Sequence, residues 1–521
     1  MTELSLTPDA DPPAFGLIAD LVGQHAAQRP SSLALAQDGR RVDYRTLDSL
    51  MDRTAAALQR DGIAPCETIV IVAGTSIEYA AVFLGALRAG VAVAPLPPGS
   101  TAASLRAMLA DSGARMMFVD DAAARLLDSG VAGVATGGPA RVSLDGSAAG
   151  RPIADWLAAE GARPVHVEPQ PDWPFNVIYS SGTTGTPKGI VQSHAMRWRH
   201  VAFAEVFGYG PQCVTLLSTP LYSNTTLVAF FPTLARGGAA VLMDKFDPSA
   251  FLELSQQHRV THTMLVPVQY QRVLAHANFD RYDLSSYQMK FCTSAPFHAA
   301  LKAEVLRRWP GGLVEFYGMT EGGGGCMLVA HAHPDKLHTV GQPLEGHDVR
   351  LIDEQGRFVA VGEAGEVVGR SLAMMSGYLN QPAMTREAEW VDENGQRYIR
   401  TGDIGRFDAD GFLTLFDRKK DMIISGGFNV YPSDLEAVLR SHPQVADVAV
   451  VGVPSEQWGE TPVAFVVPAQ SSRPDPEEIR GWANGRLGKT QRLASVRLVD
   501  ALPRSAIGKV LKRELRDAYL P

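Results

Sequence analysis

Short apolar runs and amphipathic stretches alternate along the first two thirds of the chain. Between residues 43 and 346, brief runs rich in β-branched residues are separated by longer segments whose apolar positions recur with the helical period. This alternation is typical of parallel sheets covered by helices. The expected strands are 68–72, 114–119, 177–179, 214–217, 239–243, 263–266, 290–293 and 314–317, and the expected helices include 47–60, 77–89 and 299–308.

The pattern changes beyond residue 346. Short strands with Gly and Asp turns at 349–352, 365–369 and 411–416 indicate a small β-rich portion. A helix at 433–441 and strands at 448–451, 463–467 and 496–498 then predict a compact α/β unit. The charged stretch 417–421 separates the two parts. We therefore predict an α/β protein with a large N-terminal domain, residues 1–417, of parallel or mixed sheets with packed helices and a small β-rich subdomain. A small, mobile α/β C-terminal domain, residues 418–521, follows it.

Length and composition limit the class of protein. A chain of 521 residues is too long for one ordinary core, and 45% hydrophobic with 20% charged residues is typical of a globular protein. The net charge of −8 argues against a nucleic-acid partner, so any phosphate site must be local. The four cysteines, which lack metal-binding spacing, favour a reducing, cytoplasmic location; they are Cys66, Cys213, Cys292 and Cys326.

Neither a signal peptide nor a transmembrane segment is expected. The acidic N-terminus lacks the basic start and apolar core of a signal peptide. The most apolar stretch, 79–97, contains Arg88 and Gly90 and is interrupted at Pro95. It therefore favours a helix followed by a strand over a membrane span.

A run of glycine and hydroxyl residues closed by one lysine follows the expected strand at 177–179. It reads Tyr179-Ser180-Ser181-Gly182-Thr183-Thr184-Gly185-Thr186-Pro187-Lys188-Gly189. Glycines let the backbone N–H groups converge on a ligand, and Lys188 adds a positive charge, so the expected ligand is a polyphosphate. The run is not a Walker A loop, because Pro187 precedes the lysine and Gly189 follows it. A flexible linker is the alternative interpretation.

Four further segments carry candidate chemistry. Tyr317-Gly318-Met319-Thr320-Glu321 stands at a predicted strand end, where open α/β sheets bind ligands. Asp403 is expected after a turn, where its carboxylate could accept hydrogen bonds from a ribose diol. The stretch 417–421 precedes Gly426 and Gly427, and the segment 503–509 ends in Lys509. Each could singly be a turn, a cap or a solvated loop, but their joint occurrence in this order argues for function.

This order of motifs resembles the adenylate-forming superfamily, which contains acyl- and aryl-CoA synthetases, luciferases and the adenylation domains of peptide synthetases. The resemblance extends from about residue 47 to residue 515 and is strongest to the free-standing acyl/aryl-CoA ligases. It implies a reaction in two steps. A carboxylate attacks the α-phosphate of ATP to give an acyl-adenylate and pyrophosphate, and the thiol of coenzyme A then displaces AMP. ATP, Mg²⁺ and coenzyme A are the implied cofactors and co-substrates.

The resemblance also implies roles for individual residues. Catalysis would fall to Lys188, Thr320, Glu321 and Lys509, with Glu321 as the Mg²⁺ ligand and Lys509 bridging the carboxylate and the α-phosphate. ATP and AMP would be bound by Ser181, Gly182, Thr183, Thr184, Gly185, Lys188, Ser294, Ala295, Pro296, Tyr317, Gly318, Thr320, Asp403, Arg418 and Lys509. Lys420 occupies the hinge position. Gly426, Gly427 and Trp458 would line the coenzyme A tunnel, although Trp458 could instead serve domain packing.

The chain departs from the family pattern around the acyl pocket. Ser223 replaces the usual histidine that shapes the pocket and gates the thiol tunnel, and Thr293-Ser294 replaces Gly-Gly. The glycines at 322–325 are either a flexible loop or a pocket opened for a bulky group. The expected pocket residues are Phe203, Ser223, Asn224, Pro267, Gln269, Tyr270, Thr293, Gly318, Gly323 and Gly324. Because none of these is Arg or Lys, we expect a hydrophobic aryl or medium- to long-chain monocarboxylic acid rather than a dicarboxylate.

Two other functions remain open. The adenylate could pass to an amine or to a carrier protein, or the chain could be a nucleotide-binding relic that serves as a partner protein. The presence of Lys188, Glu321, Asp403 and Lys509 argues against the relic. A homodimer is suggested by the resemblance alone.

Overall fold

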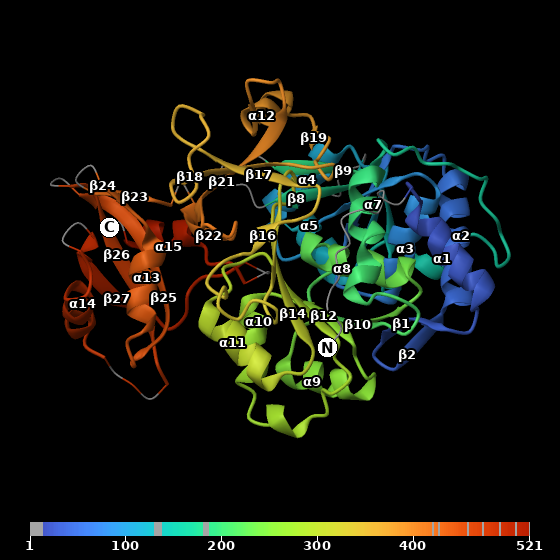
Figure 1. Ribbon diagram of the computed structural model, residues 1–521. Coiled ribbons are helices and arrows are strands. Elements are labelled where there is room, and N and C mark those ends of the chain that lie inside the picture. Colours follow the sequence, from blue (N-terminus) through green and yellow to red (C-terminus); the bar gives the residue numbers. More distant parts are fainter. Residues whose placement is uncertain are drawn as a thin grey trace. The chain divides into compact units, whose positions relative to one another are not determined.

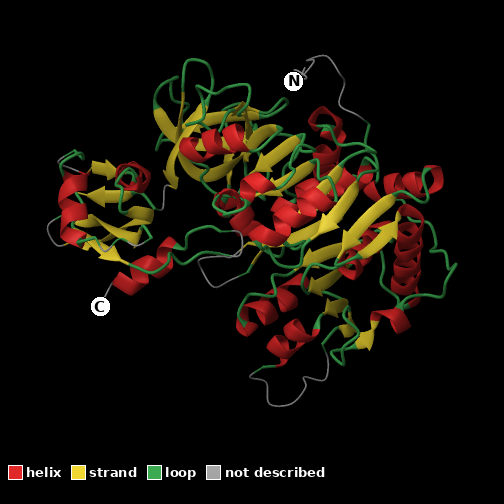
Figure 2. Ribbon diagram, turned by 90° about the horizontal axis from the view of Figure 1, so that it is seen from below, coloured by secondary structure: helices red, strands yellow, loops and turns green. Residues whose placement is uncertain are grey.

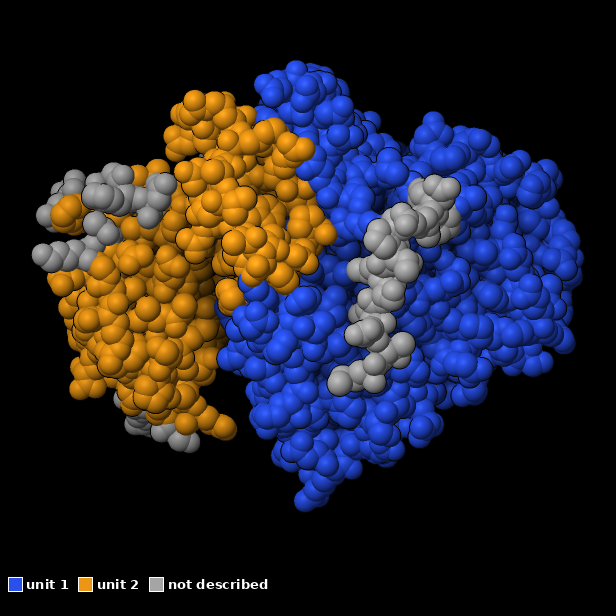
Figure 3. Space-filling view, viewed as in Figure 1, with its two compact units in different colours: residues 1–337, 344–348, 370–399 blue, residues 338–343, 349–369, 400–521 orange. Residues whose placement is uncertain are grey.

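The computed structural model describes residues 14–129, 138–180, 187–418, 421–425, 428–455, 458–470, 472, 474–488, 491–505 and 508–519, without the side chains of residues 180, 417–418 and 428–429. The chain divides into two compact units, coloured separately in Figure 3. Unit 1 comprises residues 1–337, 344–348 and 370–399, and unit 2 comprises 338–343, 349–369 and 400–521. Unit 2 thus includes β-rich segments that the sequence assigns to the first domain. The predicted domain boundary at 417/418 and the predicted hinge near Lys420 both stay predictions.

Figure 1 labels the helices and strands along the chain. The helices are α1 (Ile18–Gln28), α2 (Tyr44–Arg60), α3 (Ile77–Arg88), α4 (Ala102–Ser112), α5 (Asp121–Asp128), α6 (Ile153–Trp156), α7 (His194–Ala202), α8 (Asn224–Ala235), α9 (Pro248–Gln257), α10 (Pro267–Leu274), α11 (Ala299–Arg308), α12 (Pro382–Glu387), α13 (Pro432–Arg440), α14 (Pro476–Asn484) and α15 (Lys512–Tyr519), with 3₁₀ turns at Ala204–Phe207 and Phe279–Arg281.

The strands of unit 1 and of the β-rich segments alternate with these helices. They are β1 (Leu33–Gln37), β2 (Arg40–Asp43), β3 (Thr68–Val72), β4 (Ala92–Pro95), β5 (Met116–Val119), β6 (Ala140–Ser143), β7 (Arg151–Pro152), β8 (Pro174–Ser180), β9 (Lys188–Ser193), β10 (Val214–Leu217), β11 (Ala239–Leu242), β12 (His262–Leu265), β13 (Met289–Cys292), β14 (Gly312–Tyr317), β15 (Cys326–Val329), β16 (Gln342–Pro343), β17 (Asp348–Ile352), β18 (Ala364–Arg370), β19 (Gly377–Tyr378), β20 (Glu389–Val391), β21 (Arg397–Phe407) and β22 (Leu413–Arg418). The C-terminal strands are β23 (Ile423–Ser425), β24 (Phe428–Val430), β25 (Val445–Ser455), β26 (Gly459–Pro468) and β27 (Ser495–Leu498).

Unit 1 contains two large mixed sheets. Within this unit, the first sheet runs β15-β14-β13-β12-β10-β11-β1-β2, with parallel pairing from β14 to β1 and antiparallel strands at both edges. The second runs β19-β9-β8-β4-β3-β5-β6-β7 and is parallel from β8 to β7. Figure 2 shows the sheet strands flanked by helices. The predicted α/β class with mixed sheets is confirmed.

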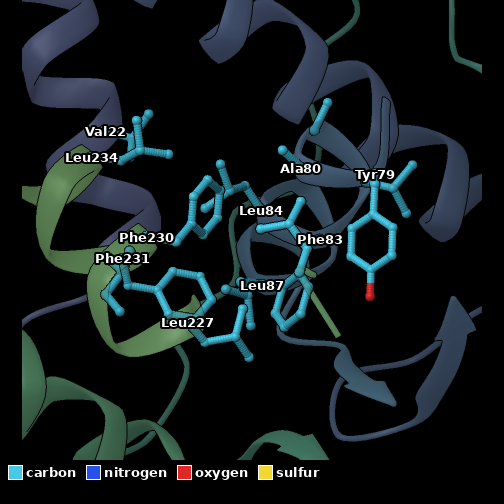
Figure 4. Close-up of a cluster of buried hydrophobic side chains, with 14 of the residues drawn as sticks. Val22, Tyr79, Ala80, Phe83, Leu84, Leu87, Leu227, Phe230, Phe231 and Leu234 are labelled. Atoms are coloured by element: carbon cyan, nitrogen blue, oxygen red, sulfur yellow. The ribbon is translucent and has the colours of Figure 1, made fainter. Parts of the chain in front are cut away.

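An aromatic and aliphatic core packs α1, α3 and α8 together. Figure 4 shows Phe83 of α3 facing Phe231 of α8, with a distance of 5.5 Å between ring centroids. Phe175 of β8 lies 5.1 Å from the Phe231 ring. Each of these rings is at most 1% exposed. Burial of each such large side chain contributes about 1.5–3 kcal/mol to the stability of the fold. Helix α8 is therefore held firmly in the core, and the residues at its N-terminus are held in place with it.

Unit 2 contains strands of two smaller sheets. In one, β18 lies between β17 and β21, and β22 pairs with β21. The other has the order β24-β23-β26-β25, with β27 parallel to β26. Helices α13 and α14 contribute Leu435, Leu439 and Ile479 to the core of this second sheet. The predicted β-rich portion and C-terminal α/β unit are both present.

The hydrophobic pattern located most elements correctly. The predicted strands 68–72 and 214–217 and the predicted helix 299–308 coincide with β3, β10 and α11. The stretch 79–97 is a helix followed by a strand, as expected. Strand β9, which begins at Lys188 and returns antiparallel to β8, was not predicted.

Candidate active site

Four neighbouring strands of the first sheet end at a common edge. They lie in the order β14-β13-β12-β10 and are mutually parallel, so the segments after their carboxyl ends come together. The predicted nucleotide residue Tyr317 ends β14, and Gly318, Thr320 and Glu321 follow it. The predicted acyl-pocket residue Thr293 and the predicted nucleotide residues 294–296 follow β13. The predicted acyl-pocket residue Gln269 follows β12, and Ser223 and Asn224 follow β10. The fold thus gathers these predicted residues at the edge where open sheets bind ligands, whereas Lys188 begins β9 of the second sheet.

Side-chain contacts connect these segments. The Thr225 and Ser294 hydroxyl oxygens lie 2.6 Å apart, and the Gln269 amide donates to the Ser218 carbonyl at 3.3 Å. The Tyr270 hydroxyl donates to the Phe291 carbonyl at 2.8 Å. Ser294 has a φ of +79°, a conformation that favours glycine. The glycine that is usual at this position in the resembled family would adopt such a φ without strain. In this chain a serine adopts it, and its hydroxyl contacts Thr225.

The start of α8 carries polar groups of the expected acyl pocket. Ser223 is 8% exposed and precedes the helix. The Asn224 Oδ1 atom is buried and has no hydrogen-bond partner among the described residues. Phe203 follows the C-terminal end of α7, where it is 41% exposed, and its place in the acyl pocket stays a prediction.

Packing explains part of the glycine run 322–325. Gly322 has a φ of +74°, and a Cβ atom there would lie 1.8 Å from the Ala373 carbonyl oxygen. A Cβ atom on Gly325 would lie 3.0 Å from the Tyr317 carbonyl oxygen. The Gly322 N–H donates to Met319 at 3.1 Å, and the Gly323 N–H donates to Ala373 at 3.3 Å. A freely flexible loop therefore does not describe Gly322, whose backbone packs closely against another segment.

Replacing Gly322 with alanine is expected to displace the loop that carries Glu321. Because backbone atoms cannot yield to a methyl group at that distance, we expect adenylation to fall by at least about tenfold, the equivalent of about 1.4 kcal/mol. The matched control is Gly395→Ala, since Gly395 has a φ of +75° and open space around its Cβ position. Equal adenylation rates in the two variants would contradict the packing argument.

Lys188 and Glu321 both contact Tyr378, which sequence reasoning missed. The Tyr378 hydroxyl donates to the Glu321 Oε1 atom at 2.8 Å, and the Lys188 Nζ atom lies 5.8 Å from the centroid of the same ring. Burial, followed by the Glu321 charge, raises the pKa of Tyr378, so its hydroxyl stays a donor at neutral pH. The only signal for this residue in the sequence is the Gly377-Tyr378 pair.

A buried hydrogen-bond relay ends at the backbone of Thr320. The Arg197 Nε atom donates to Asn176 at 2.8 Å, the Asn176 amide donates to Gln192 at 3.0 Å, and the Gln192 amide donates to the Thr320 carbonyl at 2.6 Å. All three relay side chains are at most 1% exposed. Burial lowers the pKa of Arg197 to about 9, which still leaves it charged at neutral pH. The relay links the β8–β9 hairpin and α7 to the loop before Glu321.

The predicted position of Asp403 after a turn is wrong. Residues 397–407 form one continuous strand, β21, in which Asp403 pairs with Arg418 of β22. Gly402 has a φ of +71°, and the register with β22 shifts between Asp403 and Gly405, so this stretch contains an irregularity within the strand rather than a turn. The Asp403 N–H donates to the Thr401 hydroxyl at 3.0 Å.

The remaining candidates of unit 2 lie partly outside the described residues. Lys509 is half-buried in a tight turn, where its N–H donates to the Ser505 hydroxyl at 3.2 Å. Trp458 is 48% exposed, which argues against core packing within unit 2. The candidates outside the described residues are Ser181, Gly182, Thr183, Thr184, Gly185, Lys420, Gly426 and Gly427, together with the side chain of Arg418.

The donor set around Glu321 fits a magnesium ion that arrives with a nucleotide. In the part of the chain that the structure describes, no group of three or more His, Cys, Asp or Glu side chains could hold a metal ion. Mg²⁺ commonly binds to one or two carboxylates together with substrate phosphates. Glu321 supplies one such carboxylate at a strand end.

Parallel strand ends, a carboxylate beyond β14 and Lys188 at the start of β9 agree with the resemblance to adenylate-forming enzymes. The family model of the AMP-binding enzyme matches residues 22–379, and that of the AMP-binding enzyme C-terminal domain matches 434–509. The chain therefore belongs to the AMP-binding enzyme family, in its acyl/aryl-CoA synthetase branch. This membership makes it an enzyme of the AMP-forming acid–thiol ligase type.

Individual relatives match over nearly the whole chain. A feruloyl-CoA synthase from an Amycolatopsis species is 34% identical over 95% of this chain and 98% of its own. The structure of the amide bond synthetase McbA from Marinactinospora thermotolerans superposes with a TM-score of 0.85 at 30% identity, covering 96% of this chain and 99% of its own. ATP-bound MatB from Rhodopseudomonas palustris gives 0.84 at 27% identity, with coverages of 96% and 99%. None of the helices in the described ranges has the length and apolar character needed to cross a membrane.

Proposed function

We propose that this enzyme is a carboxylate–CoA ligase for a hydrophobic aryl or medium- to long-chain monocarboxylic acid. It forms an acyl-adenylate from the acid and ATP with release of pyrophosphate, and then transfers the acyl group to coenzyme A with release of AMP. The observation that carries the proposal is the meeting of Lys188 and Glu321 on Tyr378, together with the candidate residues that follow the parallel strands β10, β12, β13 and β14.

Each residue acts on charge or orientation in the first step. Lys188 and the preceding glycine loop hold the β- and γ-phosphates, and Thr320 contacts the α-phosphate. Glu321 would hold Mg²⁺, which would neutralise phosphate charge when bound. Tyr317 and residues 294–296 enclose the adenine, while Asp403 and Arg418 bind the ribose and the nucleotide. Lys509 stabilises the negative charge that builds as the carboxylate attacks.

The second step requires the C-terminal domain to rotate about Lys420. Gly426, Gly427 and Trp458 then line the tunnel through which the thiol of coenzyme A reaches the adenylate carbonyl. The exposure of Trp458 supports a role in ligand contact.

An aryl acid is the substrate class with the best support. The feruloyl-CoA synthase relative supports it, and a predicted pocket without Arg or Lys argues against a dicarboxylate. The buried Asn224 Oδ1 atom adds one acceptor for a hydroxyl on the ring. A panel of aryl, fatty and dicarboxylic acids, scored for ATP–pyrophosphate exchange and then for AMP release with and without coenzyme A, tests this proposal. Exchange with dicarboxylates alone would overturn the substrate class.

An amine or carrier-protein acceptor is the second candidate. It is favoured by the similarity to the amide bond synthetase McbA and by Ser223 at the position of the usual gating histidine. Exchange without thioester formation would favour this acceptor class. A lack of exchange with every acid would overturn the proposed substrate class.

Replacing Gly427 with tryptophan should separate the two steps. The indole would fill the proposed thiol tunnel, so thioester formation should fall by more than about a hundredfold, the equivalent of about 2.7 kcal/mol of activation free energy. ATP–pyrophosphate exchange should change little, because the first step does not use that tunnel. AMP release with coenzyme A and exchange without it are the two measurements. Loss of exchange in a folded variant would contradict the assignment.

Location and assembly are secondary parts of the proposal. All four cysteines are free thiols, which supports a reducing, cytoplasmic location. A homodimer is proposed from the resemblance alone, and size-exclusion chromatography with light scattering tests it.

A further inference from the structure

A short segment of unit 1, residues 373–381, lies between the lysine strand and the carboxylate loop; we refer to it as the strap. Its strand β19 pairs antiparallel with β9, and Tyr378 stands opposite Ile190. The Leu379 N–H donates to the Gly189 carbonyl at 2.7 Å, and the Gln381 amide donates to the Pro187 carbonyl at 2.7 Å. The strap therefore binds the backbone on both sides of Lys188.

The same strap holds the loop that carries Glu321. The Met375 N–H donates to the Glu321 carbonyl at 2.8 Å, and the Gly323 N–H donates to the Ala373 carbonyl at 3.3 Å. Gly322 also forms a bridge with Met374. Backbone hydrogen bonds on both edges thus set the spacing between the lysine and the carboxylate.

Tyr378 extends from this strap to both charged side chains. Its hydroxyl donates to one carboxylate oxygen of Glu321 at 2.8 Å, and its ring lies 5.8 Å from the Lys188 ammonium. An ammonium over an aromatic face is held by the ring quadrupole without forming an ion pair. A hydrogen bond to one carboxylate oxygen fixes the carboxylate rotamer and preserves its charge.

We propose that Tyr378 is a positioning residue that orients Glu321 for Mg²⁺–ATP and keeps Lys188 from pairing with that carboxylate. This inference rests on the proposed function, which assigns Lys188 to phosphate and Glu321 to the metal. A direct ion pair between the two would occupy both groups. Partners that hydrogen-bond a ligating carboxylate typically change metal affinity by about 10- to 100-fold when removed.

The test compares Tyr378→Phe with the wild type in its dependence on Mg²⁺. The phenylalanine keeps the ring under Lys188 and removes only the hydrogen bond to Glu321. We expect the Mg²⁺ concentration for half-maximal ATP–pyrophosphate exchange to rise by about tenfold or more, with a smaller change in the rate at saturating Mg²⁺. The increase in Tm that Mg²⁺ adds to ATP alone should also shrink, since a ligand stabilises the folded state according to its affinity.

Tyr398→Phe is the matched control, because the Tyr398 hydroxyl also donates to a carboxylate, Asp348, at 2.7 Å. This control should leave the Mg²⁺ dependence unchanged. An unchanged Mg²⁺ dependence in Tyr378→Phe, or an equal shift in the control, overturns the inference.

The Tm measurement separates failure of the inference from failure of the proposed function. If the wild type exchanges pyrophosphate with no acid, the proposed function fails, but the Tm increment still tests Tyr378 because it needs no acid. A wild type whose Tm with ATP does not respond to Mg²⁺ overturns the inference as well.

Discussion

Lys509→Ala is expected to abolish ATP–pyrophosphate exchange and to leave the conversion of a supplied acyl-adenylate into its thioester nearly intact. Exchange requires an ammonium at the α-phosphate as negative charge develops there, and removing one such electrostatic donor costs about 10²- to 10³-fold in rate. Thioester formation starts from the finished adenylate, so the negative charge that builds on the α-phosphate during the first step no longer has to be stabilised. The two half-reactions therefore differ in their need for Lys509.

The structure indicates that this substitution is locally mild. Lys509 lies in a turn that backbone groups hold together, since the Ser505 N–H donates to the Lys509 carbonyl at 2.8 Å and Gly508 has a φ of +75°. Alanine preserves these groups. Arg513→Ala, which removes a cation that is 64% exposed from the following helix, is the control and should affect neither half-reaction. Loss of both half-reactions in a folded Lys509→Ala variant would refute the proposed alternation of domains.

Local sequence patterns were sufficient for most of the fold and for the residues that follow strand ends. Tyr317, Glu321 and Ser223 could be placed because each lies at or shortly after the end of an apolar run, and the ends of neighbouring parallel strands share one edge. The family resemblance, rather than spacing, supplied the role of Lys509. The roles of residues outside the described ranges, such as Gly427, stay predictions.

Residues that act through contacts distant in sequence could not be predicted. Tyr378 is 57 positions from Glu321, and its role depends on strand β19 pairing with β9. The relay from Arg197 through Asn176 likewise needs the β8–β9 hairpin, whose return strand was missed. Asp403 was misplaced because a glycine beside an aspartate is a turn signal, whereas here it lies at an irregularity within a strand.

Lys302→Met is expected to be among the most destabilising single substitutions in this chain. Lys302 of α11 and Glu315 of β14 form an ion pair in which the two side chains are 1% and 5% exposed. The Lys302 ammonium also donates to the Leu337 carbonyl at 2.9 Å. Removing one partner leaves a buried charge uncompensated, which typically costs about 3–5 kcal/mol. Because β14 leads directly to Tyr317, adenylation should decline along with the free energy of unfolding.

The pH dependence identifies the buried carboxylate as the cause. Burial raises the pKa of Glu315, and the Lys302 charge opposes that shift. A carboxyl group whose folded pKa is raised stabilises the fold at low pH, and this contribution is lost as the pH rises through the folded pKa. Without Lys302 the folded pKa rises further, so the deficit of the variant relative to the wild type should grow as the pH rises through the wild-type value. The slope of this deficit in unfolding free energy against pH should approach about 1.4 kcal/mol per pH unit.

A double variant completes the argument. Lys302→Met combined with Glu315→Leu removes both charges, and replacing a buried ion pair with apolar groups is often neutral or stabilising by about 1–4 kcal/mol. Urea unfolding of the wild type, both single variants and the double variant at several pH values measures the coupling between the two side chains. Recovery of stability in the double variant, with loss of the pH-dependent deficit, is the expected result. If the double variant is as unstable as Lys302→Met at every pH, the instability arises from lost packing around α11 and not from an unpaired carboxylate.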